Sequence, residues 1–115
     1  FTGFMKGQQV YEVFKASDVY VMPSVSEPFG ISPLEAMQCG VPSIISYQSG
    51  CAEILNYAVK VDYWDIDAMA DAIYALITYP EMHAFLKGEG LREVNSITWE
   101  AAGRKVRAIY DRYVR

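Results

Sequence analysis

The stretch DVYVMPSVSEPFGISPLEAMQCGVPSIIS, residues 18–46, decides the fold. It opens with a short apolar run over 18–23 that is rich in β-branched and aromatic residues and stops at a proline. Such a run predicts a buried strand of a parallel sheet. A loop rich in Ser, Pro and Gly follows, then a helical segment, and residues 41–47 predict a second strand.

The helix between these strands carries its own start and stop signals. Ser32 suits the N-cap, Pro33 the first helical position, and Glu35 the capping-box position three residues after Ser32. Gly40 is expected to end the helix, because glycine readily adopts the left-handed conformation there.

Outward from this stretch the alternation of helix and strand continues. The expected elements are a helix over 7–16, a short helix over 49–55, a strand over 58–61, a helix capped by Asp65, a helix opened by Pro80, and a final helix from Trp99 to about Tyr113 capped by Thr98. Repeated βα units predict an α/β fold, a Rossmann-like doubly wound parallel sheet with helices on both faces.

The helical patterns also predict which side chains face the core. The Asp65 helix should bury a stripe of Ile66, Met69, Ile73, Leu76 and Ile77. In the next helix, Gly88 and Gly90 are expected to weaken its end, because glycine is a poor helix former.

Composition limits the class of protein. The chain has 115 residues, of which 52% are hydrophobic, and this is enough for one compact domain over residues 1–115. A net charge of −4 argues against a nucleic-acid partner. No apolar run approaches the roughly 20 residues that cross a bilayer, and the start has no signal-peptide pattern.

The two cysteines, Cys39 and Cys51, have no spacing typical of a zinc site or a disulfide framework. Reduced thiols in a cytoplasmic protein fit this pattern best. The beginning of the chain, which has no initiator Met and starts as if at the end of a strand, indicates a piece of a longer protein.

The loop before the first long helix carries the chemistry. Backbone N–H groups at Phe29, Gly30, Ile31 and Ser32 can point at a phosphate, because the start of a helix favours negative charge. Two carboxylates, Glu27 and Glu35, flank these amides. A carboxylate only accepts hydrogen bonds and suits a pair of sugar hydroxyls, so the combination indicates a sugar nucleotide.

These residues resemble the E-x7-E signature of retaining glycosyltransferases with the GT-B fold, notably family 4, with Glu27 and Glu35 at its two ends. The resemblance extends through 16–24, 35–42 and 65–73 and covers essentially the whole chain. It implies the C-terminal, donor-binding half of a GT-B enzyme that acts in polysaccharide or glycoconjugate assembly.

The resemblance also implies roles for the site. Glu27 would contact the donor sugar as the catalytic residue, Glu35 the ribose, and the amides of Phe29, Gly30, Ile31 and Ser32 the sugar and phosphate. Transfer would retain the anomeric configuration and need no metal or other cofactor, with a nucleoside-diphosphate sugar as donor substrate. The diphosphate-holding Arg and Lys of the family lie upstream of this chain, as does the acceptor-binding N-terminal domain, so this piece alone is expected to be inactive.

Plainer interpretations stay open beside these. Glu35 can be no more than a capping partner of Ser32, and Glu27 a solvated loop residue. A stand-alone module that senses sugar nucleotides is one alternative, and a flavodoxin-like interaction domain is another. The second is disfavoured because Asp18 precedes its strand rather than following it.

Three other features receive mainly structural interpretations. His83 is interpreted as a surface or packing residue and not as a base. The basic C-terminal helix is interpreted as a solvated face, with contact to the missing domain or to the inner face of a membrane as the alternative. Of the aromatic residues, Tyr47 at the end of a strand is the one worth following.

Overall fold

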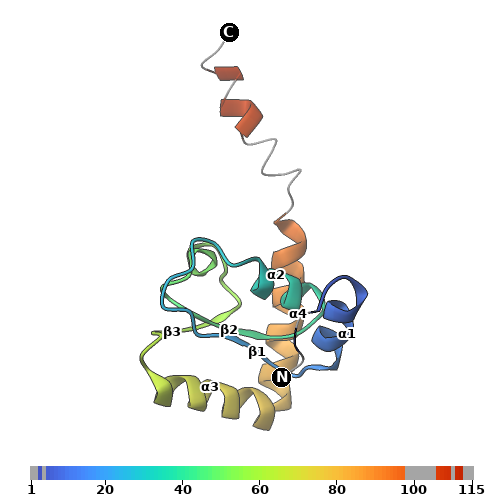
Figure 1. Ribbon diagram of the computed structural model, residues 1–115, viewed down its shortest axis with the longest axis vertical. Helices are drawn as coiled ribbons and strands as arrows, with labels where there is room; N and C mark the ends of the chain where they lie inside the picture. Colours follow the sequence, from blue (N-terminus) through green and yellow to red (C-terminus); the bar gives the residue numbers. More distant parts are fainter. Residues whose placement is uncertain (1–2, 4, 98–105, 110, 113–115) are drawn as a thin grey trace.

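The structure is a computed structural model that describes residues 3, 5–97, 106–109 and 111–112 (Figure 1). Its elements, in chain order, are α1 (Gln8–Ala16), β1 (Tyr20–Met22), α2 (Ile31–Gln38), β2 (Ser43–Ser46), the 3-10 turn η1 (Gly50–Glu53), β3 (Val59–Val61), α3 (Ile66–Thr78) and α4 (Pro80–Ser96). The predicted alternation of strand and helix is confirmed. Of the predicted final helix, residues 106–109 and 111–112 are helical, and its cap Thr98 lies outside the described residues.

The three strands form one parallel sheet in the order β1-β2-β3. Val21 lies beside Ile44 and Met22 beside Ile45, and Ile44 in turn lies beside Val59. Helices pack on both faces of this sheet (Figure 1). The expected α/β, doubly wound architecture is therefore confirmed. No helix in the described residues is long and apolar enough to cross a membrane.

One face of the sheet packs against α2 and the second half of α4. Ile45 of β2 is fully buried there, together with Met37 of α2 and Val94 of α4, and Met22 packs against this cluster. Alternation along a strand sends neighbouring side chains to opposite faces, so Val21 and Ile44 point the other way. They pack against α3 and the first half of α4. α4 thus contributes to both layers.

The buried face of α3 differs from the predicted stripe. Met69, Ile73 and Leu76 pack inward, but Ile66 and Ile77 are 76% and 64% exposed. At 3.6 residues per turn, the two missed positions fall at the rim of the face centred on Met69 and Leu76. The remaining inward positions are alanines, Ala68 and Ala72. The predicted cap is confirmed, because the Asp65 carboxylate accepts a 3.0 Å hydrogen bond from the Ala68 amide.

Gly40 lies just after α2, and Gly88 and Gly90 lie within α4. Gly40 follows α2 with φ +79°, and its N–H bonds the Met37 carbonyl while the Val41 N–H bonds the Ala36 carbonyl, each at 3.0 Å. This is the Schellman arrangement, so Gly40 ends α2 as predicted. The expected weakening of this helix at Gly88 and Gly90 stays a prediction, and α4 continues past both glycines to Ser96.

Gly90 also has a role in packing α4 against α2. It is buried, and a Cβ added there would lie 3.0 Å from the Met37 Cε. Glycine therefore lets α4 approach α2 closely, and the tertiary contact offsets its low helix propensity.

Glu93 of α4 ties that helix to the chain between η1 and β3. Its carboxylate accepts bonds of 2.8 and 3.0 Å from the Asn56 amide and of 3.0 Å from the Tyr57 amide. A carboxylate that satisfies backbone amides in a turn stabilises more than an exposed ion pair does. The nearby ion pair between Arg92 and Glu89 is such an exposed pair, because the Arg92 side chain is 76% exposed.

Glu93→Ala should lower the free energy of unfolding by about 1.5–3 kcal/mol, because two backbone amides lose a charged acceptor. Arg92→Ala should change it by less than about 1 kcal/mol. Urea unfolding of both variants, followed by circular dichroism, measures the difference. Equal losses of unfolding free energy in the two variants would contradict the role of Glu93 in holding α4 to residues 56 and 57.

Candidate functional site

The carboxyl ends of the three parallel strands meet at one edge of the sheet, where ligands bind in open α/β folds. The loop after β1, residues 23–30, carries Glu27 and leads into α2. It lies beside residues 47–49, which follow β2. The next loop, 62–65, follows β3.

Backbone hydrogen bonds join the loop after β1 to the loop after β2. The Gly50 N–H donates to the Glu27 carbonyl at 2.8 Å, and the Cys51 N–H donates to the Phe29 carbonyl at 2.6 Å. The Glu27 N–H donates to the Gln48 carbonyl at 3.4 Å. The chain that carries Glu27 is thus held as a short strand-like segment beside Ser49 and not as a free loop.

Gly50 is required here for space. A Cβ added to it would lie 1.9 Å from the Pro28 carbonyl oxygen and 2.9 Å from the Phe29 Cα. No side chain fits against backbone at such distances, so the two loops approach as closely as they do because residue 50 has no Cβ. The short 3-10 turn η1, which begins at Gly50, is therefore a structural support of the acidic loop.

α2 begins two residues earlier than predicted. Gly30 is its N-cap residue, with φ +91°, and no side chain caps the helix within the described structure. The predicted Ser32 cap and its capping box with Glu35 are therefore wrong. The loop contacts at residues 27–29 force the turn into the helix at Gly30, where the positive φ favours glycine. Glu35 is left without the local role that the plainer interpretation gave it.

The start of α2 has free hydrogen-bond donors. Within the described residues, no acceptor bonds the N–H groups of Phe29, Gly30, Ile31 and Ser32. Pro33 follows, and it has no N–H to satisfy. Free amides together with the helix dipole give this end of α2 a partial positive charge that an anion can neutralise.

Glu27 lies against this helix start. Its Cγ would be 3.4 Å from a Cβ at Gly30, and Met22 Cε and Cys51 Sγ would be at 3.0 and 3.2 Å. Gly30 is buried by these three side chains, and Glu27 is half-buried. The predicted sugar-binding carboxylate and the predicted amides are therefore adjacent.

An apolar groove of about 840 Å³ opens beside α2. Three of the predicted site residues, Phe29, Ile31 and Glu35, line it, and Glu27, Gly30 and Ser32 lie outside its lining. Phe29 and Ile31 are 40% and 54% exposed, which is unusual for such side chains. No Lys or Arg is among the described residues that line the groove. The rest of its lining comes from α1, α2, the residue after η1 and the end of α4, through Tyr11, Leu34, Gln38, Ile54, Val94, Asn95 and Ile97.

Tyr20 is a member of this site that the sequence reasoning missed. Burial raises the pKa of its phenol, electrostatic interactions with Cys51, Glu35 and Glu27 act in the same direction, and a side-chain hydrogen bond with Ser32 lowers it. Both site carboxylates thus act on this phenol. The only sign of this role in the sequence is the position of Tyr20 two residues before Met22. The two side chains share one face of the strand, and Val21 between them points to the other face.

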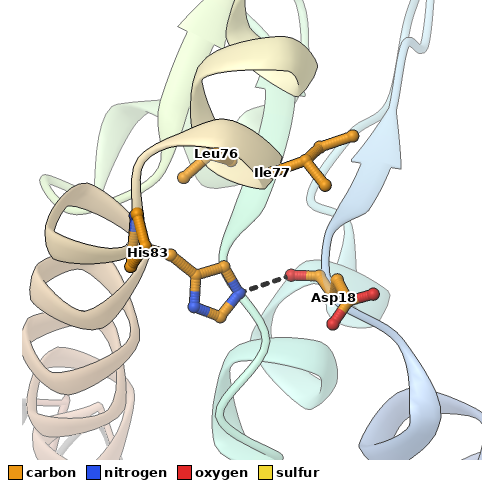
Figure 2. A pocket seen from close by; sticks show the side chains of 5 residues that line it. Asp18, Leu76, Ile77 and His83 are labelled. Carbon is orange, nitrogen blue, oxygen red and sulfur yellow. Dashed lines mark hydrogen bonds between the residues drawn. The ribbon is translucent and has the colours of Figure 1, made fainter.

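The interpretation of His83 as a surface or packing residue is confirmed. His83 Nε2 lies 2.8 Å from the Asp18 carbonyl oxygen in a small hollow at the amino end of β1 (Figure 2). A carbonyl only accepts, so Nε2 carries the hydrogen and His83 fastens α4 to β1. Cys39 and Cys51 are free thiols. Tyr47 is 57% exposed. The described residues hold no group of three His, Cys, Asp or Glu suited to a metal ion.

Comparison with known families gives a match over most of the chain. The model of the family described as glycosyl transferases group 1 matches residues 1–91. An uncharacterized glycosyltransferase of Methanocaldococcus jannaschii is 46% identical over 60 residues, which are 52% of this chain and 15% of that protein. A D-inositol 3-phosphate glycosyltransferase of Saccharomonospora viridis is 30% identical over 110 residues, 93% of this chain and 25% of that protein.

Solved structures with the same fold are also found. Sucrose-phosphate synthase from Thermosynechococcus elongatus superposes with a TM-score of 0.82 at 29% identity, over 97% of this chain and 29% of that one. Anabaena HepE, solved in complex with UDP-glucose, superposes with a TM-score of 0.73 at 20% identity, over 78% of this chain and 26% of that one. The chain thus spans between about a seventh and a third of the length of these proteins.

Gly50→Ala should destabilise the protein by about 1–3 kcal/mol, because the added methyl group collides with the Pro28 carbonyl and separates the two loops. Gly88→Ala is the matched control: nothing lies within 4 Å of its added Cβ, and relief of glycine in a helix should stabilise by about 0.5–1 kcal/mol. Thermal and urea unfolding measure both. A Gly50→Ala variant as stable as the unsubstituted protein would show that the loops are not in contact.

Alkaline pH should destabilise the protein through Tyr20. Its folded pKa is raised above the ordinary value of 10.0, so the contribution of the neutral phenol is fully present below that value and is lost as the pH rises through the folded pKa. Tyr20→Phe should flatten the fall of stability with pH above about 10, and Tyr74→Phe, at an exposed position, should not. Urea unfolding across this pH range tests it, and identical profiles for the two variants would contradict it.

Proposed function

The chain belongs to the glycosyl transferases group 1 family, and from this premise we propose that it binds a nucleoside-diphosphate sugar as the donor-binding domain of a GT-B glycosyltransferase. One observation carries the proposal. The free amides at the start of α2 lie between two carboxylates, with Glu27 packed against Gly30 and Glu35 lining the groove.

The arrangement matches the parts of such a donor in order. The diphosphate is the group that the amides of residues 29–32 attract, since it is the only strongly anionic part. A carboxylate at each side accepts from hydroxyl groups and repels phosphate, so both carboxylates suit the two sugars of the donor. Glu27 would hold the transferred sugar and Glu35 the ribose of the nucleotide.

The shape of the site supports the same assignment for Glu35. It lies one turn along α2 from the free amides and faces an apolar groove large enough for a nucleoside. A ribose that follows the diphosphate along α2 therefore reaches Glu35, and a base beyond it enters the groove. HepE, whose fold this chain shares, was solved in complex with UDP-glucose.

Transfer itself would proceed with retention and without a bound metal, by holding the sugar in position and stabilising the departing diphosphate. The free amides supply part of that stabilisation. The cations that complete it would come from elsewhere in a longer cytoplasmic enzyme, together with an acceptor-binding domain.

Titration calorimetry of the chain with UDP, GDP, ADP and their common sugar conjugates tests donor binding. We expect one nucleotide series to bind. Glu35→Ala should weaken the nucleotide and its conjugate alike, by about tenfold to a hundredfold, because a charged acceptor of the ribose is lost. Glu27→Ala should weaken the conjugate by a similar factor and the nucleotide much less.

Glu81→Ala is the matched control, because Glu81 is exposed at the start of α4 and takes part in no ion pair or side-chain hydrogen bond within the described residues. It should leave every affinity unchanged. Binding that is indifferent to both site substitutions would sink the assignment of Glu27 and Glu35. Failure of all nucleotides to bind the unsubstituted chain would sink the proposed function for it.

A further inference from the structure

Gln48 holds together the loops that follow all three strands. Its side-chain amide Nε2 donates to Asp62 Oδ1 at 3.1 Å, and its Oε1 accepts from the Tyr63 N–H at 3.1 Å. Its backbone carbonyl accepts the Glu27 N–H at 3.4 Å. A single residue, Gln48, thus contacts the loop after β1 with its main chain and the loop after β3 with its side chain.

The main-chain contact is part of a wider set of bonds. Tyr47, just before Gln48, donates its N–H to the Val61 carbonyl at 2.9 Å, and Gly50, just after Ser49, donates to the Glu27 carbonyl at 2.8 Å. Residues 47–50 therefore lie between β3 on one side and the acidic loop on the other. The backbone position of Gln48 is defined from both sides, and the position of Glu27 follows from it.

We propose that Gln48 is a positioning residue for Glu27: by fixing residues 47–50 against Asp62 and Tyr63, it sets where the Glu27 carboxylate meets the sugar of the donor. The inference rests on the proposed function and deepens it. Gln48 acts through Glu27 and touches no substrate.

The chemistry of the contact explains why an amide is needed. Asp62 offers an acceptor and the Tyr63 N–H offers a donor, and one primary amide satisfies both at the same time. A carboxylate at position 48 would keep the bond from Tyr63 but would face the Asp62 carboxylate with like charge. An alanine would lose both bonds.

The proposal predicts a selective defect. Glu35 and the free amides of Ile31 and Ser32 lie within α2, which packs on β1, β2 and α4 and makes no hydrogen bond with Gln48 within the described residues. Loss of the Gln48 contacts should therefore displace Glu27 and leave the nucleotide-binding part in place. A merely structural residue would alter both parts or neither.

The test uses the whole chain and two ligand pairs, UDP-glucose with UDP and GDP-mannose with GDP, measured by titration calorimetry. For the pair that binds, Gln48→Ala should weaken the sugar nucleotide by about tenfold and the free nucleotide by less than about twofold, because two net hydrogen bonds that hold Glu27 are lost. Gln9→Ala, at an exposed position of α1, should change neither affinity. Thermal unfolding confirms that each variant is folded.

Three further variants separate positioning from a general loss of stability. Gln48→Glu should be as defective as Gln48→Ala, and Gln48→Glu combined with Asp62→Asn should recover sugar binding, because the donor and acceptor are exchanged across the same contact. In a Glu27→Ala background, Gln48→Ala should cost no further affinity, since the two residues act as a unit.

The outcomes distinguish the inference from the proposed function. If Glu27→Ala weakens the sugar nucleotide selectively and Gln48→Ala does not, the proposed function stands and the inference is overturned. Additive losses in the double variant, or no recovery in the exchanged pair, would overturn the inference as well. If the unsubstituted chain binds neither of these pairs nor any ligand of the ADP series, the proposed function fails, and the inference fails with it.

Discussion

Two backbone hydrogen bonds, from Gly50 to Glu27 and from Cys51 to Phe29, set the geometry on which the rest of the site depends. They join the loop after β1 to the segment after β2, and they form only because Gly50 presents no side chain to the Pro28 carbonyl. With the loop held there, the chain must turn sharply at Gly30 to enter α2. Ile45 of the sheet and Met37 of α2 pack together in the buried core beneath. This packing fixes the position of α2 relative to the turn at Gly30.

The same constraint explains why the helix start is chemically available. A side-chain cap would satisfy the first amides of α2 and leave them nothing to offer a ligand. Here the cap position is taken by Gly30, which has no side chain, and the first four amides counted from Phe29 stay unbonded within the described residues. A small stability cost at the helix end is thus coupled to the proposed anion site. We expect the nearby Glu27 and Glu35 carboxylates to disfavour an anion that lacks hydroxyl groups.

Much of the fold could be predicted because it rests on local signals. The strands, the Asp65 cap and the stop at Gly40 each follow from a few neighbouring residues, and all three are confirmed. The error at Ser32 arises where distant contacts decide, because Gly30 takes the cap position. The close approach of α4 to α2 at Gly90 is likewise a distant contact that local signals do not predict. The candidate carboxylates were found from their spacing, whereas Tyr20 and Gln48 were not, since their roles depend on which loops the sheet brings together.

Unlike α2, α3 and α4, α1 has no buried residue, although it forms one wall of the groove through Tyr11. An element that buries little apolar surface needs little free energy to detach, and far less than the strands and α2, whose side chains fill the core. The groove is therefore bounded by a rigid floor and a weakly attached wall. We expect its width to change by local opening of α1 while the sheet, the helix start and the acidic loop keep their positions, so that a bulky base could enter without any rearrangement of the groups proposed to hold the rest of the donor.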